Sequence, residues 1–304
     1  MPGSERTAVI AAMPAVFVLI WSTGFVVARY GMPHAPPLSF LAWRYALSVA
    51  AFAVWIAWAK PAWPREPVQW LHLGATGALM HAGYLGGVWA AVKAGIPAGT
   101  VSLIVGLQPV LTALWVSLTL GAATREHRVG VRQWLGLGLG LAGLALVVGR
   151  KFGLGEVTPL NLALSVLALA SITAGTPYQK RFVAPCDVRT ANTIQLLAAF
   201  VVTAPLAVFE TEPVVLHPEL IGAMAWSVLA LTLGGSSLLY LLIQRGAATR
   251  VASLMYLVPP CTALLAWWLF DEALGLPVLA GIALTAVGVA LVVRAPVPRK
   301  ENTA

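Results

Sequence analysis

The sequence carries little charge. Only 10% of its 304 residues are Asp, Glu, Lys or Arg, whereas soluble domains average roughly 25%. Hydrophobic residues make up 59%, and the mean hydropathy is +0.85, so an ordinary soluble domain is excluded. A bilayer core needs roughly 20 apolar residues per helical crossing, and such runs recur along the whole chain. The sequence therefore predicts an all-α polytopic membrane protein in contact with the lipid bilayer.

Cysteine is scarce as well. One of the two cysteines lies in a predicted loop (Cys186) and the other inside a predicted helix (Cys261), so we expect no disulfide framework. A net charge of +8 would suggest a nucleic-acid partner for a soluble protein. Here Lys and Arg lie in short loops, where they orient a membrane protein, and we expect no nucleic-acid partner. The first apolar run has no small-residue cleavage site, and we interpret it as a retained span.

Apolar runs bounded by proline, glycine and charge predict ten transmembrane helices. They lie near residues 7–30, 38–59, 67–91, 98–120, 132–149, 158–181, 188–209, 218–243, 249–270 and 275–293. With the amino terminus in the cytoplasm, 14 Lys and Arg residues fall on the cytoplasmic side, and only Arg29, Lys93, Arg150 and Lys151 fall on the other. The positive-inside rule requires such an asymmetry. An even number of helices then predicts that both termini are cytoplasmic.

The two halves of the chain resemble each other at an offset of 151 residues. Residues 95–114 fall on residues 246–265, with matching Gly, Ser and Pro in the same order. We therefore predict two five-helix repeats, residues 1–151 and 152–304. Because five is odd, the second repeat enters the membrane from the opposite side. Inverted repeats are typical of secondary transporters, whose substrate site lies near the midplane between the halves.

Proline interrupts the two matching helices at equivalent depth. Pro109 lies in the fourth predicted helix, and Pro259 and Pro260 lie in the ninth. Proline frees carbonyls from the helical ladder, and such breaks are tolerated at membrane depth where they line a cavity or are buried in protein. We favour cavity lining, with a simple packing kink as the alternative.

Several short motifs occur in an order that resembles one transporter family. They are residues 21–25 (WSTGF), residues 40–45 (FLAWRY), residues 253–260 (SLMYLVPP) and the pair Asp271-Glu272. Together they resemble the drug/metabolite transporter superfamily, its EamA-type ten-helix exporters and, more narrowly, the YddG-like amino acid exporter branch. The resemblance implies export of small metabolites, often aromatic amino acids, across a bacterial inner membrane, with cationic toxicants as alternative substrates. One loop departs from the family, because residues 121–132 are basic where an acidic residue is common.

Aromatic, amide and hydroxyl side chains predict a neutral cavity wall that suits an amino acid. Ring stacking contributes about 0.5–1.5 kcal/mol beyond burial, and an amine can lie over a Trp or Tyr face. We expect the cavity to include Trp21, Ser22, Phe25, Arg44, His81, Tyr84, Ser102, Gln108, Gln195, Ser237, Tyr240, Gln244, Ser253 and Tyr256.

Arg44 stands out because it is the one basic residue well inside a predicted span. It lies too deep to reach the membrane surface easily. Pinning of neighbouring helices and binding of a substrate carboxylate both remain open as its role.

Carboxylates are absent from the interior of the predicted spans. All 11 Asp and Glu residues fall in predicted loops or helix ends, whereas a proton-coupled antiporter usually needs a titratable group inside the membrane. We therefore expect alternating access by facilitated diffusion or exchange, or coupling through His81.

A membrane enzyme or a channel would need other features. An enzyme requires an activated nucleophile or clustered metal ligands, but the histidines show no ligand spacing, and a channel usually has a ring of charge or carbonyls. We expect no catalysis, no cofactor and no metal. Glycine strings within residues 136–143 and 281–288 predict close packing of the fifth and tenth helices, either within one protomer or between two. The oligomeric state stays open, and a monomer is compatible with the sequence.

Overall fold

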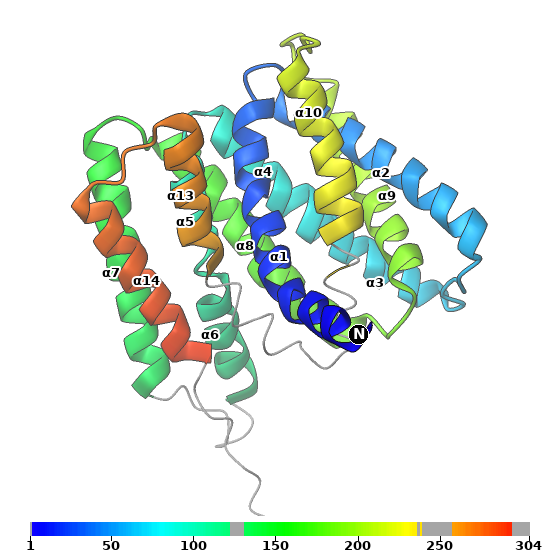
Figure 1. The fold of residues 1–304 in the computed structure, drawn as a ribbon, viewed down its shortest axis with the longest axis horizontal. Helices are drawn as coiled ribbons and strands as arrows, with labels where there is room; N and C mark the ends of the chain where they lie inside the picture. Colours follow the sequence, from blue (N-terminus) through cyan, green and yellow to red (C-terminus); the bar gives the residue numbers. More distant parts are fainter. Residues whose placement is uncertain (1, 122–130, 236–237, 239–256, 294–304) are drawn as a thin grey trace, which may run out of the picture.

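The computed structural model describes residues 2–121, 131–235, 238 and 257–293. Every regular element in these residues is a helix (Figure 1), which confirms the predicted all-α fold class. The helices are α1 (Pro2–Gly31), α2 (Pro37–Ala59), α3 (Pro67–Gly77), η1 (Ala78–Gly83), α4 (Tyr84–Lys93), α5 (Ala98–Val105), α6 (Gln108–Gly121), α7 (Val131–Gly153), α8 (Pro159–Phe182), α9 (Val188–Ala207), α10 (Pro218–Trp226), η3 (Ser227–Gly235), α13 (Val258–Phe270) and α14 (Leu276–Val293).

Five of the described helical segments are long and apolar enough to cross a bilayer. They are Pro37–Ala59, Trp134–Gly153, Pro159–Phe182, Val188–Ala207 and Pro218–Gly235, and further apolar helices are shorter. Large apolar side chains such as Trp58, which is 85% exposed, point away from the bundle. Surfaces of this kind suit lipid rather than water. The total of ten spans and the repeat boundary after residue 151 remain predictions.

Local signals set the beginning of several helices. Proline occupies the first turn of α2, α3, α8 and α10, where its missing N–H leaves no bond unmade. At the start of α8, Thr158 and Asn161 form a capping box. The Asn161 backbone amide donates to Thr158 Oγ1 at 3.2 Å, and the Thr158 backbone amide donates to Asn161 Oδ1 at 2.9 Å. Because these signals act over one turn, the predicted starts near residues 38, 67, 158 and 218 agree with the structure.

Two of the helical paths contain a π-helical segment. η1 joins α3 to α4, and η3 continues α10. In η3 the Thr232 hydroxyl donates to the Ser227 carbonyl five residues earlier, at 2.8 Å. Shifted by 151 residues, η1 falls inside η3. Single π-helical turns occur frequently at functional sites.

The predicted proline breaks lie against each other. The chain leaves α5 at Gly106 and enters α6 just before Pro109, while α13 begins beside Pro259 and Pro260. A Cβ placed on Gly106 would lie 2.7 Å from Pro259 Cγ. Glycine therefore permits the close approach of the two breaks.

Helices α7 and α14 form a tightly packed pair at one side of the molecule (green and orange-red in Figure 1). A Cβ placed on Gly143 would lie 2.5 Å from the Gly281 carbonyl oxygen, and one placed on Gly288 would lie 2.5 Å from the Gly136 carbonyl oxygen. Small residues let membrane helices approach to backbone contact. The structure confirms the predicted close packing and places it within one protomer.

Candidate transport cavity

A cavity of about 810 Å³ enters the bundle among α1, α2, α3, η1, α4, α8, α9 and η3. This volume is in the range of sites that bind small molecules, about 300–1,000 Å³. Residues 183–186, in the connection between α8 and α9, border the cavity. The cavity therefore reaches the end of the bundle that carries this connection and the amino terminus, the lower end in Figure 1.

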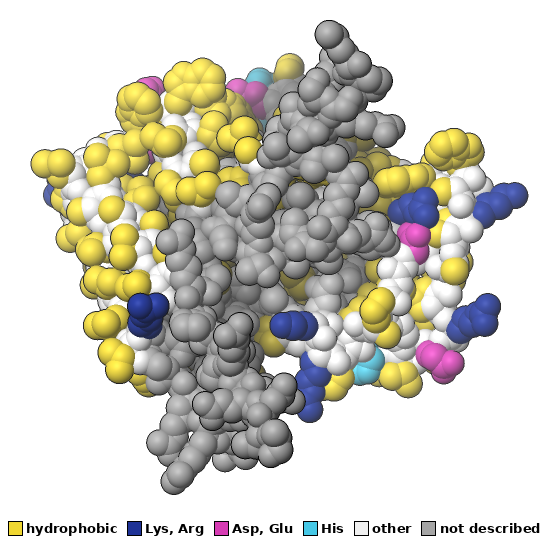
Figure 2. All heavy atoms as spheres, turned by 60° about the horizontal axis from the view of Figure 1, so that its bottom comes forward, with side chains coloured by type: hydrophobic (Ala, Val, Ile, Leu, Met, Phe, Trp, Pro, Cys, Tyr) yellow, Lys and Arg dark blue, Asp and Glu magenta, His cyan; other side chains and the backbone are white. Residues whose placement is uncertain are grey.

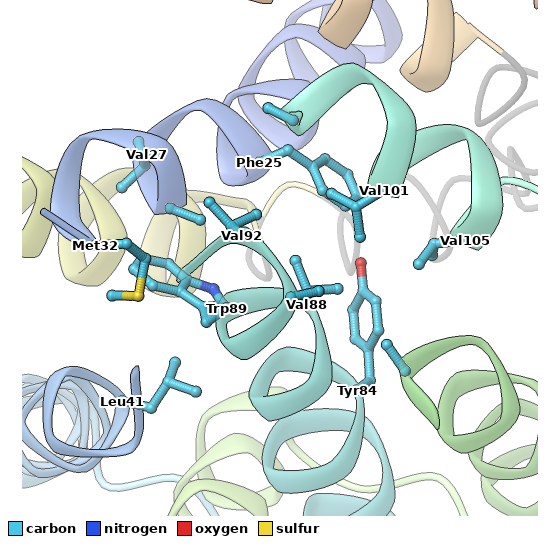
Figure 3. Close-up of a cluster of buried hydrophobic side chains, with 14 of the residues drawn as sticks. Phe25, Val27, Met32, Leu41, Tyr84, Val88, Trp89, Val92, Val101 and Val105 are labelled. Carbon is cyan, nitrogen blue, oxygen red and sulfur yellow. The ribbon is translucent and has the colours of Figure 1, made fainter. Parts of the chain in front are cut away.

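Apolar side chains of α1, α4 and α5 close the inner end of the cavity. Phe25, Val88 and Trp89 border it and are only 4%, 2% and 1% exposed. Figure 3 shows Phe25 from α1 and Val101 from α5 beside Val88, with the Tyr84 hydroxyl pointing toward Val101. Packed side chains thus separate the cavity from the opposite end of the bundle.

Arg44 of α2 lies on the cavity wall and is 7% exposed. Its Nη2 donates to Thr232 Oγ1 of η3 at 3.2 Å, and its guanidinium carbon lies 6.0 Å from the centroid of the Trp89 ring. Among the described residues, Arg44 Nε has no hydrogen-bond partner. A buried donor without a partner is costly, so this site favours an acceptor, above all an anionic one, inside the cavity.

His81 of η1 lies on the same wall as Arg44. The Tyr45 hydroxyl donates to the His81 carbonyl at 2.8 Å, and the two rings meet edge to face with centroids 6.2 Å apart. The His81 side chain also interacts with the side chain of Gln195 on α9. The ring contact with Tyr45 and the interaction with Gln195 orient the imidazole.

Of the residues predicted for the cavity, six lie on its wall: Trp21, Phe25, Arg44, His81, Tyr84 and Gln195. The described wall of this cavity does not include Pro109, Pro259 or Pro260. Pro259 and Pro260 instead lie beside Gly106 and face α14. Five predicted residues lie outside the described residues: Ser237, Tyr240, Gln244, Ser253 and Tyr256.

The structure places three other predicted residues away from the described wall of this cavity. The Ser22 hydroxyl donates to the carbonyl of Val18 at 2.7 Å, and the Ser102 hydroxyl donates to that of Gly99 at 2.8 Å. Gln108 Nε2 donates to two threonine hydroxyls, each at 3.2 Å. Serine in an apolar helix can bond back to its own backbone, so a hydroxyl does not by itself indicate a cavity.

Apart from Gln195, the wall residues contributed by α8 and α9 were not predicted from the sequence. From α8 the wall includes Ile172, Thr176, Gln179 and Lys180, and it continues at Val183 just after the helix. These positions follow one another at helical spacing and form one face. On α9, the residues one and two turns before Gln195 also line the cavity: Val188, Ala191 and Asn192. The helical periodicity of α9 could have identified these three residues, because they lie on the same face of the helix as Gln195.

The mouth of the cavity carries a capped and charged helix start. Asp187 is the N-cap of α9 and pairs with Arg189, whose Nη2 lies 2.7 Å from Asp187 Oδ2. The Arg189 hydrogen bond holds the pKa of Asp187 below its ordinary value, while burial raises the pKa of the neighbouring Cys186 thiol. Figure 2 brings this end of the molecule forward and shows Lys and Arg side chains among hydrophobic ones.

The opposite end is tied together by contacts between distant segments. The Glu210 carboxylate accepts two amide hydrogen bonds at the start of α2, at 2.9 and 2.7 Å, and a third from the Ser39 hydroxyl at 2.8 Å. Glu272 accepts two amide bonds at the start of α5, at 3.0 and 3.4 Å. Lys93 pairs with Glu212. Carboxylates at helix starts also interact favourably with the helix dipole.

An all-helical membrane bundle with a solute-sized cavity closed at one end is the architecture of a membrane transporter. The sequence profile of the EamA-like transporter family matches residues 7–149 and 160–294. The chain therefore belongs to this family, within the superfamily that its motifs resemble.

Similar proteins agree with this assignment. An uncharacterized transporter of Bacillus subtilis (strain 168), YvbV, is 26% identical, and the match covers 94% of this chain and 91% of the relative. A probable amino-acid metabolite efflux pump of Escherichia coli (strain K12) is 25% identical, over 89% of each protein. A protein of known crystal structure, 20% identical, aligns with a TM-score of 0.63 over 92% of this chain and 95% of that one, which supports the fold.

Proposed function

We propose that this protein exports amino acids, above all aromatic ones, from the cytoplasm, and that Arg44 binds the substrate carboxylate. The surroundings of Arg44 carry the proposal. This buried guanidinium donates to Thr232, and its Nε has no acceptor in the described residues. No Asp or Glu occurs among the described residues of the wall. A carboxylate would supply the missing acceptor, and guanidinium and carboxylate can pair through two parallel hydrogen bonds.

The remaining wall suits the other parts of an aromatic amino acid. Trp21 and Tyr84 offer ring faces for stacking or for an ammonium group. Phe25 and Val88 supply apolar surface for a side chain. The name of the Escherichia coli relative, a probable amino-acid metabolite efflux pump, supports the same substrate class and the YddG-like amino acid exporter branch.

A broad exporter of cationic toxicants is the second function that the sequence suggested. Two cationic side chains, Arg44 and Lys180, lie on the described wall without a carboxylate beside them there. Like charges in a cavity oppose the binding of a cation. The charge of the described wall therefore favours zwitterions or anions.

We propose that transport occurs by alternating access between two inverted repeats, residues 1–151 and 152–304. The π-helical segments lie at equivalent positions of the two repeats and both contribute to the cavity wall, and the family profile matches one segment in each half. We also propose a bacterial inner-membrane location with both termini cytoplasmic, which the excess of basic residues on that side supports. The cavity then faces the cytoplasm in this structure.

The test compares two substrates that share a ring and an amine but differ in the carboxylate. Proteoliposomes loaded with phenylalanine or with phenethylamine report counterflow of each compound. We expect phenylalanine to be transported and phenethylamine to be transported poorly. Because a hydrogen bond to a charged group contributes about 1.5–3 kcal/mol, Arg44→Gln should lower phenylalanine counterflow by about 10- to 100-fold.

Lys180→Gln is the matched control, because it removes the same charge from the mouth of the same cavity. It should change counterflow much less than Arg44→Gln, and Arg44→Lys should not rescue transport, because lysine lacks the planar fork. Equal transport of phenethylamine and phenylalanine by the wild type would contradict the proposal and favour the cationic exporter.

We further propose facilitative or exchange-type transport, since no carboxylate lines the described wall. Counterflow should persist when an ionophore collapses the proton gradient. Suppose that His81→Asn is as active as the wild type while the proton gradient is present, and that collapse of the gradient abolishes counterflow in both proteins. That result would contradict this proposal and also coupling through His81.

A further inference from the structure

The fold brings together three metal-ligating side chains that lie far apart in the sequence. His34 lies in the connection between α1 and α2, His217 is the N-cap of α10, and Glu219 lies in the first turn of α10. The ligand atoms of all three residues lie within 4.8 Å of one another. The histidine spacing in the sequence shows no such cluster. The connection between α1 and α2 and the start of α10 both lie at the upper end of Figure 1, opposite the mouth of the cavity.

The distances between the side-chain ligand atoms are close to those around a coordinated metal ion. His34 Nε2 lies 2.7 Å from Glu219 Oε2, and His217 Nδ1 lies 3.7 Å from the same oxygen. Metal–nitrogen and metal–oxygen bonds of about 2.0–2.2 Å in a tetrahedral site place ligand atoms about 3.3–3.5 Å apart. The two imidazoles are already stacked, with centroids 4.2 Å apart and an interplanar angle of 14°. His34 Nε2 and Glu219 Oε2 are hydrogen-bonded to each other, and His217 Nδ1 accepts a hydrogen bond from the Glu219 backbone amide at 3.3 Å. Binding of an ion through these atoms would replace both hydrogen bonds.

The site is accessible and its ligand set is selective. The His34 and Glu219 side chains are 17% and 48% exposed, and that of His217 is 46% exposed, so an ion can reach them from the surrounding water. Two imidazole nitrogens and one carboxylate oxygen suit Zn²⁺ and neighbouring divalent transition metals, and they do not suit Ca²⁺ or Mg²⁺, which prefer oxygen ligands.

We propose that His34, His217 and Glu219 form a binding site for a divalent transition-metal ion, and that the bound ion pins the closed end of the transporter. The Val215 amide already donates to the His34 carbonyl at 2.8 Å. An ion held by His34 on one side and by His217 and Glu219 on the other would replace the His34–Glu219 hydrogen bond with metal coordination between the same two segments. Opening of this end during transport requires this coordination to break, so the ion inhibits transport.

Binding can be tested apart from transport with Co²⁺ as the probe. Co²⁺ in a tetrahedral site gives intense visible absorption, and Zn²⁺ should displace it. The experiment uses the full chain purified in detergent without a polyhistidine tag. We expect the band in the wild type and its loss, with affinity reduced at least about tenfold, in each of His34→Gln, His217→Asn and Glu219→Gln. Asparagine at position 217 preserves an N-cap, so this variant separates loss of a ligand from loss of the helix start.

His72→Gln is the matched control, because His72 lies in α3, at the cavity end of the bundle, where it contacts Tyr178. This variant should keep the Co²⁺ band. Absence of the band in the wild type, or its persistence in all three cluster variants, would overturn the metal site.

Inhibition is then measured as counterflow in proteoliposomes with and without Zn²⁺. We expect Zn²⁺ to inhibit the wild type and His72→Gln but not His34→Gln. A wild type that binds Co²⁺ but transports equally well with Zn²⁺ present would overturn the pinning role. Failure of the proposed amino acid substrate would leave the Co²⁺ result intact, so the two proposals fail separately.

Discussion

At the cavity end of the bundle, residues 183–186 border the cavity, and Asp187 pairs with Arg189 two residues further along the chain. At the opposite end, Glu210 and Glu272 each cap a helix from a distant part of the chain. Distant segments are joined at the first end by uncharged hydrogen bonds, such as the two that Gln69 exchanges with the backbone of Ala184 at 2.8 and 3.2 Å. At the second end they are joined by charged carboxylates that cap helix starts. The contacts of the second end must break before a transporter can open there. These contacts therefore set the balance between the state in which the cavity end is open and the state in which the opposite end is open.

The largest effect should come from Glu210→Ala, which removes three hydrogen bonds of 2.7–2.9 Å. Loss of a helix cap costs up to about 2 kcal/mol, which corresponds to a roughly 30-fold change in the ratio of two states. The closed end should then open more often and the cavity mouth should close more often. The maleimide labelling rate of Cys186, measured with Cys261→Ala as the background, should therefore fall.

The matched control is Glu66→Ala, because Glu66 is a glutamate at the start of a helix, the N-cap of α3, but makes no side-chain cap bond. It should leave the labelling rate unchanged. An unchanged rate in Glu210→Ala would show that the contacts of the closed end do not set the balance.

Glu272→Ala should act in the same direction but more weakly. Its two amide bonds are 3.0 and 3.4 Å long, and hydrogen bonds weaken as their geometry departs from the optimum. We expect about 1 kcal/mol, or roughly a fivefold change in the ratio of states, in the same labelling assay. An effect larger than that of Glu210→Ala would reverse the ranking that the distances predict.

The smallest effect should come from Asp187→Asn at the cavity end. Because Arg189 lowers the pKa of Asp187 below 3.8, the charged carboxylate stabilises the folded protein above its unfolded-state pKa, and this contribution is lost as pH falls through the lowered folded-state pKa. Asparagine keeps the cap, so at pH 7 the variant should lose only about 0.3–1 kcal/mol.

Thermal unfolding in detergent, measured at pH 7 and again below the folded-state pKa, checks this prediction. The wild type and Asp187→Asn should differ at pH 7 and converge at the low pH. A difference that grew on acidification would contradict the assigned sign.

Local features made much of the fold predictable from sequence. The proline and capping residues at the starts of α2, α3, α8 and α10 act within a single turn. The apolar runs indicate which segments lie in the bilayer. Gly143 and Gly281 were also predictable as a close helix contact, because nothing larger fits between touching backbones. Whether that contact lay within a protomer or between protomers depended on the tertiary fold.

The cavity was predictable only in part. Trp21, Arg44 and His81 were predicted for the cavity, and all three lie on its wall. Ser22 and Ser102 looked equally suitable, but each bonds to its own helix instead. The rotation of a helix that is apolar all round cannot be judged from its sequence, because no polar face marks the side that meets the cavity.

The sequence by itself determined that this chain crosses a membrane as helices, where several of those helices begin, and that one basic residue, Arg44, lies well inside a predicted span beside aromatic residues. Each of these follows from composition or from interactions within a turn. Only the tertiary structure decided that Arg44 faces Thr232 from the other half, that the proline breaks touch, and that His34 meets His217 and Glu219. These contacts join residues more than a hundred positions apart, and lipid-facing and protein-facing surfaces are equally apolar, so only the packed fold selects among them.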